Sequence, residues 1–182
     1  MKRETRKIRF SAKLLRPATP KGATWCFLIL PTGASSKLPT RAMTTVEGTI
    51  GGTPFRATLE PDGQRSHWLK VSRKLRKDAG AIVGDRVELE ISPAAKQLEP
   101  RLPADFRQAL AAVPGARAAW SDITTIARRD WIQWISSAKK TETRVRRIDR
   151  ACEMLANGKG RVCCFDRSGI YSKGLSAPEA AK

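Results

Sequence analysis

Residues 46–59 read V-E-G-T-I-G-G-T-P-F-R-A-T-L, and this stretch decides the fold. Two β-rich runs flank the pair Gly51-Gly52. A Gly-Gly pair between such runs indicates a hairpin, because a tight turn needs positive φ angles that glycine adopts freely. The stretch therefore predicts two antiparallel strands joined at Gly51-Gly52.

Residues 66–91 continue S-H-W-L-K-V-S-R-K-L-R-K-D-A-G-A-I-V-G-D-R-V-E-L-E-I. We expect a short strand at 68–71 and a basic helix at 72–79, with Ser72 as its N-cap and Gly80 as its C-terminal stop. After the turn at Gly84-Asp85, residues 86–91 alternate strictly between polar and apolar side chains, which predicts another strand.

Upstream, residues 8–14 alternate cleanly and predict a first strand, with its apolar side chains facing inward. The continuous apolar run at 23–30 predicts a second strand that is buried on both faces. Many short strands with Gly and Pro between them favour a small barrel. The fold class expected is therefore α+β, a six-stranded small β-barrel followed by a cap of three to four α-helices.

The hydrophobic period changes from 2 to 3.6 after a proline-rich linker at 93–103. Helices are expected at 104–112, from Thr124 or Thr125 to about residue 138, and from an N-cap at Thr141 to Asn157-Gly158, with only a short turn at 116–121. The expected organisation is a basic extension at 1–5, a barrel domain at 6–92, the linker, a helical region at 104–159 and a mostly flexible tail at 160–182. Residues 162–165 could add a short strand to that tail.

Apolar side chains form one stripe on each of the last two helices. On the first, Trp131, Trp134 and Ile135 fall at i, i+3 and i+4; the second carries Val145, Ile148, Cys152 and Leu155. The tryptophans have two interpretations. They are core anchors that join helix to barrel, or they are exposed platforms on which nucleic-acid bases stack.

Two segments resemble known families. The strand–helix–V-G-D-R-V-E-L-E-I pattern resembles the swapped-hairpin domains of AbrB/MazE-type regulators, and with residues 46–59 it is similar to a small β-barrel domain of unknown function. Residues 134–148 read W-I-x-x-A-K-x-x-E-T-R-x-x-R-I and resemble the helical region of the bacteriocin-protection, YdeI/OmpD-associated family. Residues 151–159, A-C-E-M-L-A-N-G-K, fit that family's ending. The resemblance implies a barrel followed by helices, and it brings no catalytic residues.

The formal net charge of the 182-residue chain is +18, and it is unevenly distributed. Residues 1–21 contain eight basic and one acidic residue, and residues 128–160 contain nine basic and four acidic residues. Residues 22–92 are nearly balanced, with ten basic and seven acidic residues. Such an excess favours polyanionic partners, either nucleic acid or an acidic protein surface. The alternative is a generally basic, soluble surface.

Basic side chains near the start of the last helix form a candidate polyanion site. A helix N-terminus is partly positive and has free N–H groups, so it suits phosphate or carboxylate. The candidates are Lys139, Lys140, Thr141, Arg144, Arg147 and Arg150, together with Arg3, Arg6 and Lys7 near the N-terminus. The alternative interpretation of the helical residues is a solvated face.

No pattern of catalytic or metal-binding residues is present. His67 is the single histidine, and the four cysteines lack zinc-like spacing, so we expect no metal, no cofactor and free thiols. No apolar run reaches the ~18 residues of a membrane span and no signal segment is found, so we expect a cytoplasmic protein without a membrane span. Six strands in one chain can complete the barrel alone, so we expect a monomer. The expected function is a non-enzymatic binder of nucleic acid or another polyanion. The alternatives are a protein-interaction or bacteriocin/stress-protection protein and, last, a small-molecule enzyme.

Overall fold

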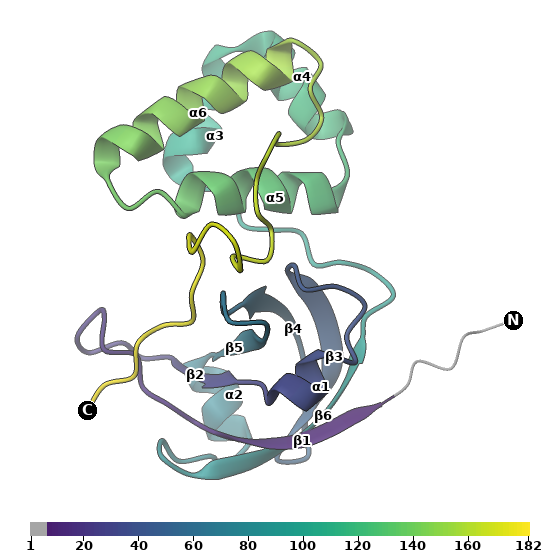
Figure 1. The fold of residues 1–182 in the computed structure, drawn as a ribbon, viewed down its shortest axis with the longest axis vertical. Helices are drawn as coiled ribbons and strands as arrows, with labels where there is room; N and C mark the ends of the chain where they lie inside the picture. Colours follow the sequence, from purple (N-terminus) through teal and green to yellow (C-terminus); the bar gives the residue numbers. More distant parts are fainter. Residues whose placement is uncertain (1–6) are drawn as a thin grey trace, which may run out of the picture. The chain divides into compact units, whose positions relative to one another are not determined.

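A computed structural model describes residues 7–182 (Figure 1). The chain divides into two compact units. One contains the residues up to Gln97 together with Asp166–Lys182, and the other contains Leu98–Phe165. The first unit is built on strands and the second on helices, so the α+β class is confirmed.

The first unit is a curled, six-stranded antiparallel sheet with the strand order β1-β6-β3-β4-β5-β2. The two outermost strands approach each other at one bridge beyond β1, where Leu15 and Phe27 exchange backbone hydrogen bonds of 2.7 and 2.9 Å. The sheet therefore curls around one core, as a small barrel requires. The strands are β1 (Ile8–Lys13), β2 (Cys26–Ile29), β3 (Thr44–Ile50), β4 (Thr53–Pro61), β5 (His67–Val71) and β6 (Arg86–Pro93).

The hairpin expected at Gly51-Gly52 is confirmed. Strands β3 and β4 pair from Ile50 and Thr53 outward, and the two glycines have φ angles of 53° and 80°. The helix of the following segment is also confirmed as α2 (Arg73–Asp78), and the Ser72 hydroxyl accepts a hydrogen bond from the Leu75 N–H at 3.1 Å. The strand expected at 23–30 is shorter than predicted, because only Cys26–Ile29 pair with β5.

The apolar side chains of the alternating strands fill the interior of the sheet. Residues of β1 that alternate in sequence also alternate in burial, with Ile8 and Ala12 inside and Arg9 and Lys13 outside. A one-turn helix, α1 (Thr32–Ser35), contributes Ala34 to the same core. Ile29 departs from the prediction that β2 is buried on both faces, because 40% of its surface is exposed.

The second unit packs four helices around its own core, which includes Phe106, Leu110, Trp131, Ile135 and Leu155. Ala116–Ser121, expected as a short turn, lies within a nine-residue helix. The reason is that Pro114 occupies the first turn, where proline's fixed φ and missing N–H suit a helix start. The helices are α3 (Ala104–Ala112), α4 (Pro114–Asp122), α5 (Thr125–Ser136) and α6 (Thr141–Ala156).

Three expectations about α6 and the residues after it are wrong. The N-cap of α6 is Lys140 and not Thr141, and no side chain of the described residues caps this end. Val145, expected on the buried stripe, is 53% exposed, while Ile148, Cys152 and Leu155 are buried. Residues 162–165 form no strand; Cys163 and Cys164 lie in a turn instead.

The last segment, residues 166–182, belongs to the sheet unit and hydrogen-bonds to residues that follow β1. Ala18 N–H donates to Glu179 O and Ala181 N–H donates to Arg16 O, both at 2.8 Å. The Asp166 carboxylate accepts backbone N–H bonds at 2.9–3.1 Å, two of them from Tyr171 and Ser172. The mobility expected of this tail stays a prediction, but the segment has defined partners.

Gly48 provides a test of the strand packing. An added Cβ at this position would lie 1.9 Å from the Glu90 carbonyl oxygen of the neighbouring strand. We expect Gly48→Ala to destabilise the protein by ~1–3 kcal/mol or more, because the backbones of β3 and β6 must separate. The measurement is equilibrium urea unfolding. Gly33→Ala is the control, because a Cβ at Gly33 meets nothing within 4 Å. Equal stabilities of the two variants would contradict this packing.

Candidate functional site: a tryptophan–arginine groove

The two tryptophans of α5 have different environments. Trp131 is fully buried, and its indole N–H donates to Gly160 O at 3.3 Å. Trp134 is only half-buried and meets Trp131 edge to face, with ring centroids 5.9 Å apart. Both belong to the core of the helical unit rather than to that of the sheet. Trp131 is therefore a core anchor, but of the helical unit's own core, where the prediction had it join helix to barrel. Trp134 also offers a surface.

Arg147 of α6 holds the end of α5 around Trp134. Its guanidinium donates to the Trp134 carbonyl oxygen and, at 2.9 Å, to the Ser137 hydroxyl. The last carbonyl groups of a helix lack intrahelical partners and carry partial negative charge, so a guanidinium is favourable there. The same group also lies 5.3 Å from the Trp134 ring centroid, within the range of a cation–π contact.

These contacts border a groove with a volume of about 820 Å³. Trp134 contributes an aromatic surface, and α6 contributes the remaining side chains. The volume is within the usual range of ligand sites. The lining residues are Trp134, Thr143, Arg146, Arg147, Asp149, Arg150 and Glu153.

The groove lining contains three arginines and two carboxylates, so the groove has a small net positive charge. Arg150 and Glu153 form only a long ion pair of 3.5 Å, with both side chains more than 60% exposed. An exposed pair of this kind is weak and leaves Arg150 able to bind a stronger anion. Arg146, which is not among the candidates predicted from the sequence, contributes to the lining without joining any of the ion pairs formed within residues 7–182.

The remaining predicted site residues do not join the groove. Arg144 makes a two-pronged contact with Asp105 of α3 at 2.7 and 3.0 Å, which lowers the pKa of Asp105. Lys139 and Lys140 in the α5–α6 connection and Thr141 at the start of α6 are exposed, and they lie outside the groove lining.

At the other end of the chain, Lys7 pairs with Glu90 at 2.6 Å. Arg9, one residue further along β1, pairs with the same carboxylate at 2.6 Å. These contacts neutralise part of the positive charge predicted for the N-terminal segment. Arg3 and Arg6 lie outside the described residues.

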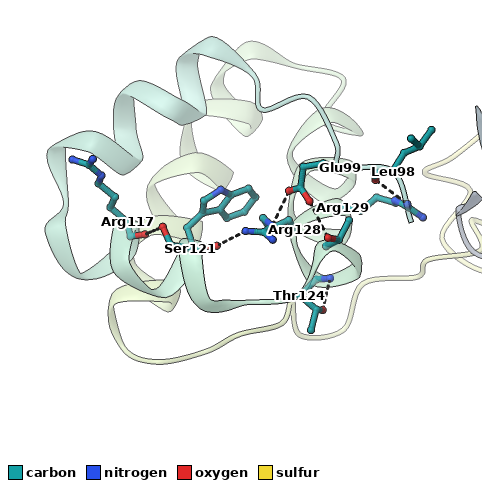
Figure 2. A network of polar contacts seen from close by, with 10 residues as sticks. Leu98, Glu99, Arg117, Ser121, Thr124, Arg128 and Arg129 are labelled. Carbon is teal, nitrogen blue, oxygen red and sulfur yellow. Dashed lines mark hydrogen bonds and ion pairs between the residues drawn. The ribbon is translucent and has the colours of Figure 1, made fainter. Parts of the chain in front are cut away.

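Two further arginines of the basic segment support the helical unit itself (Figure 2). The Arg128 Nε lies 2.8 Å from Glu99, and its Nη1 donates to Trp120 O at 3.3 Å. Arg129 is buried and donates to Leu98 O at 3.3 Å. These contacts join α5 to α4 and to the residues before α3. Part of the positive charge of residues 128–160 is therefore paired with groups inside the helical unit.

His67 lies in a closed polar cluster. Its Nε2 is 3.0 Å from Ala42 O, so Nε2 carries the proton and Nδ1 accepts from the Ser35 hydroxyl at 2.8 Å. Both side chains are fully buried. A serine–histidine pair needs access to a substrate to act as a nucleophile and base. This pair is fully buried, and its hydrogen bonds link α1 and Ala42 to β5.

The cysteines remain free thiols. Cys163 and Cys164 are adjacent and exposed, with their sulfur atoms 3.3 Å apart. Within residues 7–182, no three His, Cys, Asp or Glu side chains are grouped as a metal site would need. Across the same residues, none of the helices combines the length and apolar composition required to cross a membrane.

Two family models match the chain, one over each part. Residues 99–158 match the family described as bacteriocin-protection, YdeI or OmpD-associated. Residues 10–91 match the domain of unknown function DUF1905. The resemblances to the YdeI/OmpD-associated family and to the domain of unknown function are thereby confirmed, with the domain of unknown function preceding the helical region in the chain. The likeness to AbrB/MazE-type regulators stays a prediction. Among curated proteins, no sequence matches this chain.

The two tryptophans should respond differently to truncation. Trp131→Ala removes a fully buried ring and should lower the free energy of unfolding by ~3–5 kcal/mol. Trp134→Ala removes a half-buried ring and should have a smaller effect. Equilibrium urea unfolding measures both. A larger loss for Trp134→Ala would contradict the assignment of Trp131 as the core anchor.

His67 should remain neutral to lower pH than an ordinary histidine. Burial lowers its pKa, and the Ala42 hydrogen bond and Asp62 oppose that shift only in part. NMR titration of this single imidazole should give a midpoint below about 6.5. Since the unfolded chain then binds the proton more readily, this contribution to stability is present above pH ~6.5 and is lost as pH falls below it. A midpoint at or above 6.5 would contradict the closed environment.

Proposed function

We propose that this chain is a non-enzymatic binding module whose helical unit binds single-stranded nucleic acid in the groove beside Trp134. The observation that supports this most is the combination of a half-exposed indole with Arg146, Arg147 and Arg150 in one groove. Proteins that bind single strands without strong sequence preference combine an aromatic surface for bases with cationic groups for phosphates.

The groove geometry favours a single strand over a duplex. A base has to be unstacked to lie on an indole ring, and a single strand offers such bases at little energetic penalty. Arg147 is already held by the Trp134 carbonyl and Ser137, so the ring and its cation are ordered before a ligand arrives. Arg146 joins no ion pair within residues 7–182, and Arg150 has only its exposed 3.5 Å pair with Glu153, so both are able to contact phosphate.

Binding rather than catalysis is the proposed activity. The chain's single histidine is enclosed with Ser35, and the one hydroxyl of the groove lining, Thr143, makes no hydrogen bond to Asp149 or Glu153 among the described residues. Arginine is always protonated and cannot serve as a base near neutral pH. These groups suit recognition of an anion.

An acidic protein surface is the second candidate partner. Val145 supports it, because this apolar side chain is 53% exposed on α6, the helix that carries the groove arginines. An apolar contact beside basic side chains is typical of protein interfaces, where arginine is also enriched. Binding of nucleic acid would not explain an exposed apolar side chain at Val145.

Salt-dependent binding tests the nucleic-acid proposal. We expect the wild type to bind single-stranded RNA with an affinity that falls steeply with salt, by a log–log slope of about −0.7 per phosphate contacted. The double variant Arg146→Gln/Arg150→Gln should bind more weakly and with a shallower slope. Arg144 and Arg147 are left intact, because their contacts with Asp105 and Trp134 support the fold.

The matched control is Arg107→Gln/Arg117→Gln, which removes the same charge from exposed positions of the helical unit outside the groove. It should leave affinity and slope nearly unchanged. Equal losses in both double variants would indicate attraction to the overall charge and contradict the groove. Absence of binding at about 50 mM salt would contradict nucleic-acid binding altogether, and loss of a protein partner on Val145→Asp would favour the second candidate.

A further inference from the structure

A second basic pocket lies in the sheet unit, separate from the groove on the helices. It has a volume of about 220 Å³. Three of the residues that line it are arginines, and none is acidic. Gly22, Ala23, Thr24, Cys26 and Val83 complete the lining beside Arg16, Arg73 and Arg76.

The two arginines of α2 have no carboxylate partner on their own helix. Arg73 and Arg76 are separated by three positions and therefore lie on one face of the helix. The helix has one carboxylate, Asp78, and it is paired with Lys74 at 2.5 Å. The charge of Arg73 and Arg76 is thus not neutralised from within the helix.

Arg76 has an unsatisfied donor inside the unit. Its Nε is buried and has no hydrogen-bond partner among the described residues. A buried, unpaired donor on a charged group is unfavourable, and most such groups in folded proteins have a partner. An anion in the pocket would offset the charge of this guanidinium, which can present two donors side by side.

We infer that this pocket binds a phosphate-type oxyanion. Three guanidinium groups and the Thr24 hydroxyl offer donors around a small volume, whereas a groove for a polymer would be open and longer. Its volume is below the ~300–1,000 Å³ of ordinary ligand sites, so only the anionic group itself enters. The group is inorganic phosphate or the phosphate of a small monoester, and both share this chemistry.

The inference is independent of the proposed function. The pocket residues belong to the sheet unit and the groove residues to the helical unit. The two sites share no lining residue, so each is tested by its own substitutions and failure of either idea is distinguishable from failure of the other.

The test uses the full chain at constant ionic strength. Inorganic phosphate and ribose 5-phosphate are titrated separately by calorimetry, with chloride as the reference anion. We expect binding of at least one phosphate compound. Arg76→Gln and Arg73→Gln should each weaken it about tenfold, because each removes a charge-assisted hydrogen bond. Tighter binding of ribose 5-phosphate would identify an organic monoester as the ligand class, and equal affinities would identify phosphate alone.

Lys77→Gln is the matched control, because it removes one charge from an exposed position of the same helix without touching the pocket lining. It should retain wild-type affinity. If the wild type binds neither compound at about 10 mM, that result overturns the inference, whatever the variants do. An equal loss in Lys77→Gln and Arg76→Gln would also overturn it, because the effect would then be one of general charge.

Discussion

The contact of Arg147 with the end of α5 is the interaction on which the site depends. One guanidinium satisfies the Trp134 carbonyl, holds Ser137 and lies over the Trp134 ring. It therefore ties α6 to the end of α5 beside the half-buried indole. Without it, the carbonyl at the end of α5 would lack its guanidinium donor and the groove would lose its ordered aromatic surface.

Arginines in this protein divide into those that build the fold and those that remain available. Arg128, Arg129 and Arg144 connect segments of the helical unit through carbonyl and carboxylate groups. Arg146 and Arg150 face the groove with no strong partner among the described residues. Net charge alone does not make this distinction, because a paired arginine contributes little to attraction of a polyanion. The contacts of each arginine therefore show which of the basic side chains remain available to bind an anion.

The local parts of the fold were predictable from the sequence because they depend on near neighbours. Gly51-Gly52, Ser72 and Gly158 act through backbone conformation and capping, and each occupies the expected place. Helix α4 was not predictable in the same way, because Pro114-Gly115 is typical of a break, although proline is also favourable at a helix start.

The site was predictable only in part because its contacts join residues far apart in the sequence. Helical spacing predicts Val145 on the buried stripe, but the neighbouring helices cover only the side of Ile148 and Leu155. Spacing also could not show that Arg144 faces Asp105 or that Arg147 faces Trp134. Arg16 and Arg76 likewise meet at one pocket only because the sheet brings them together.

The central claim is that Trp134 is the surface on which a ligand base stacks. NMR spectra that resolve the indole N–H signals measure this directly during titration with a short single-stranded RNA. The account predicts a large shift for the Trp134 signal and little change for Trp131, whose N–H is bonded to Gly160 inside the core. An unchanged Trp134 signal at saturating RNA would contradict the account.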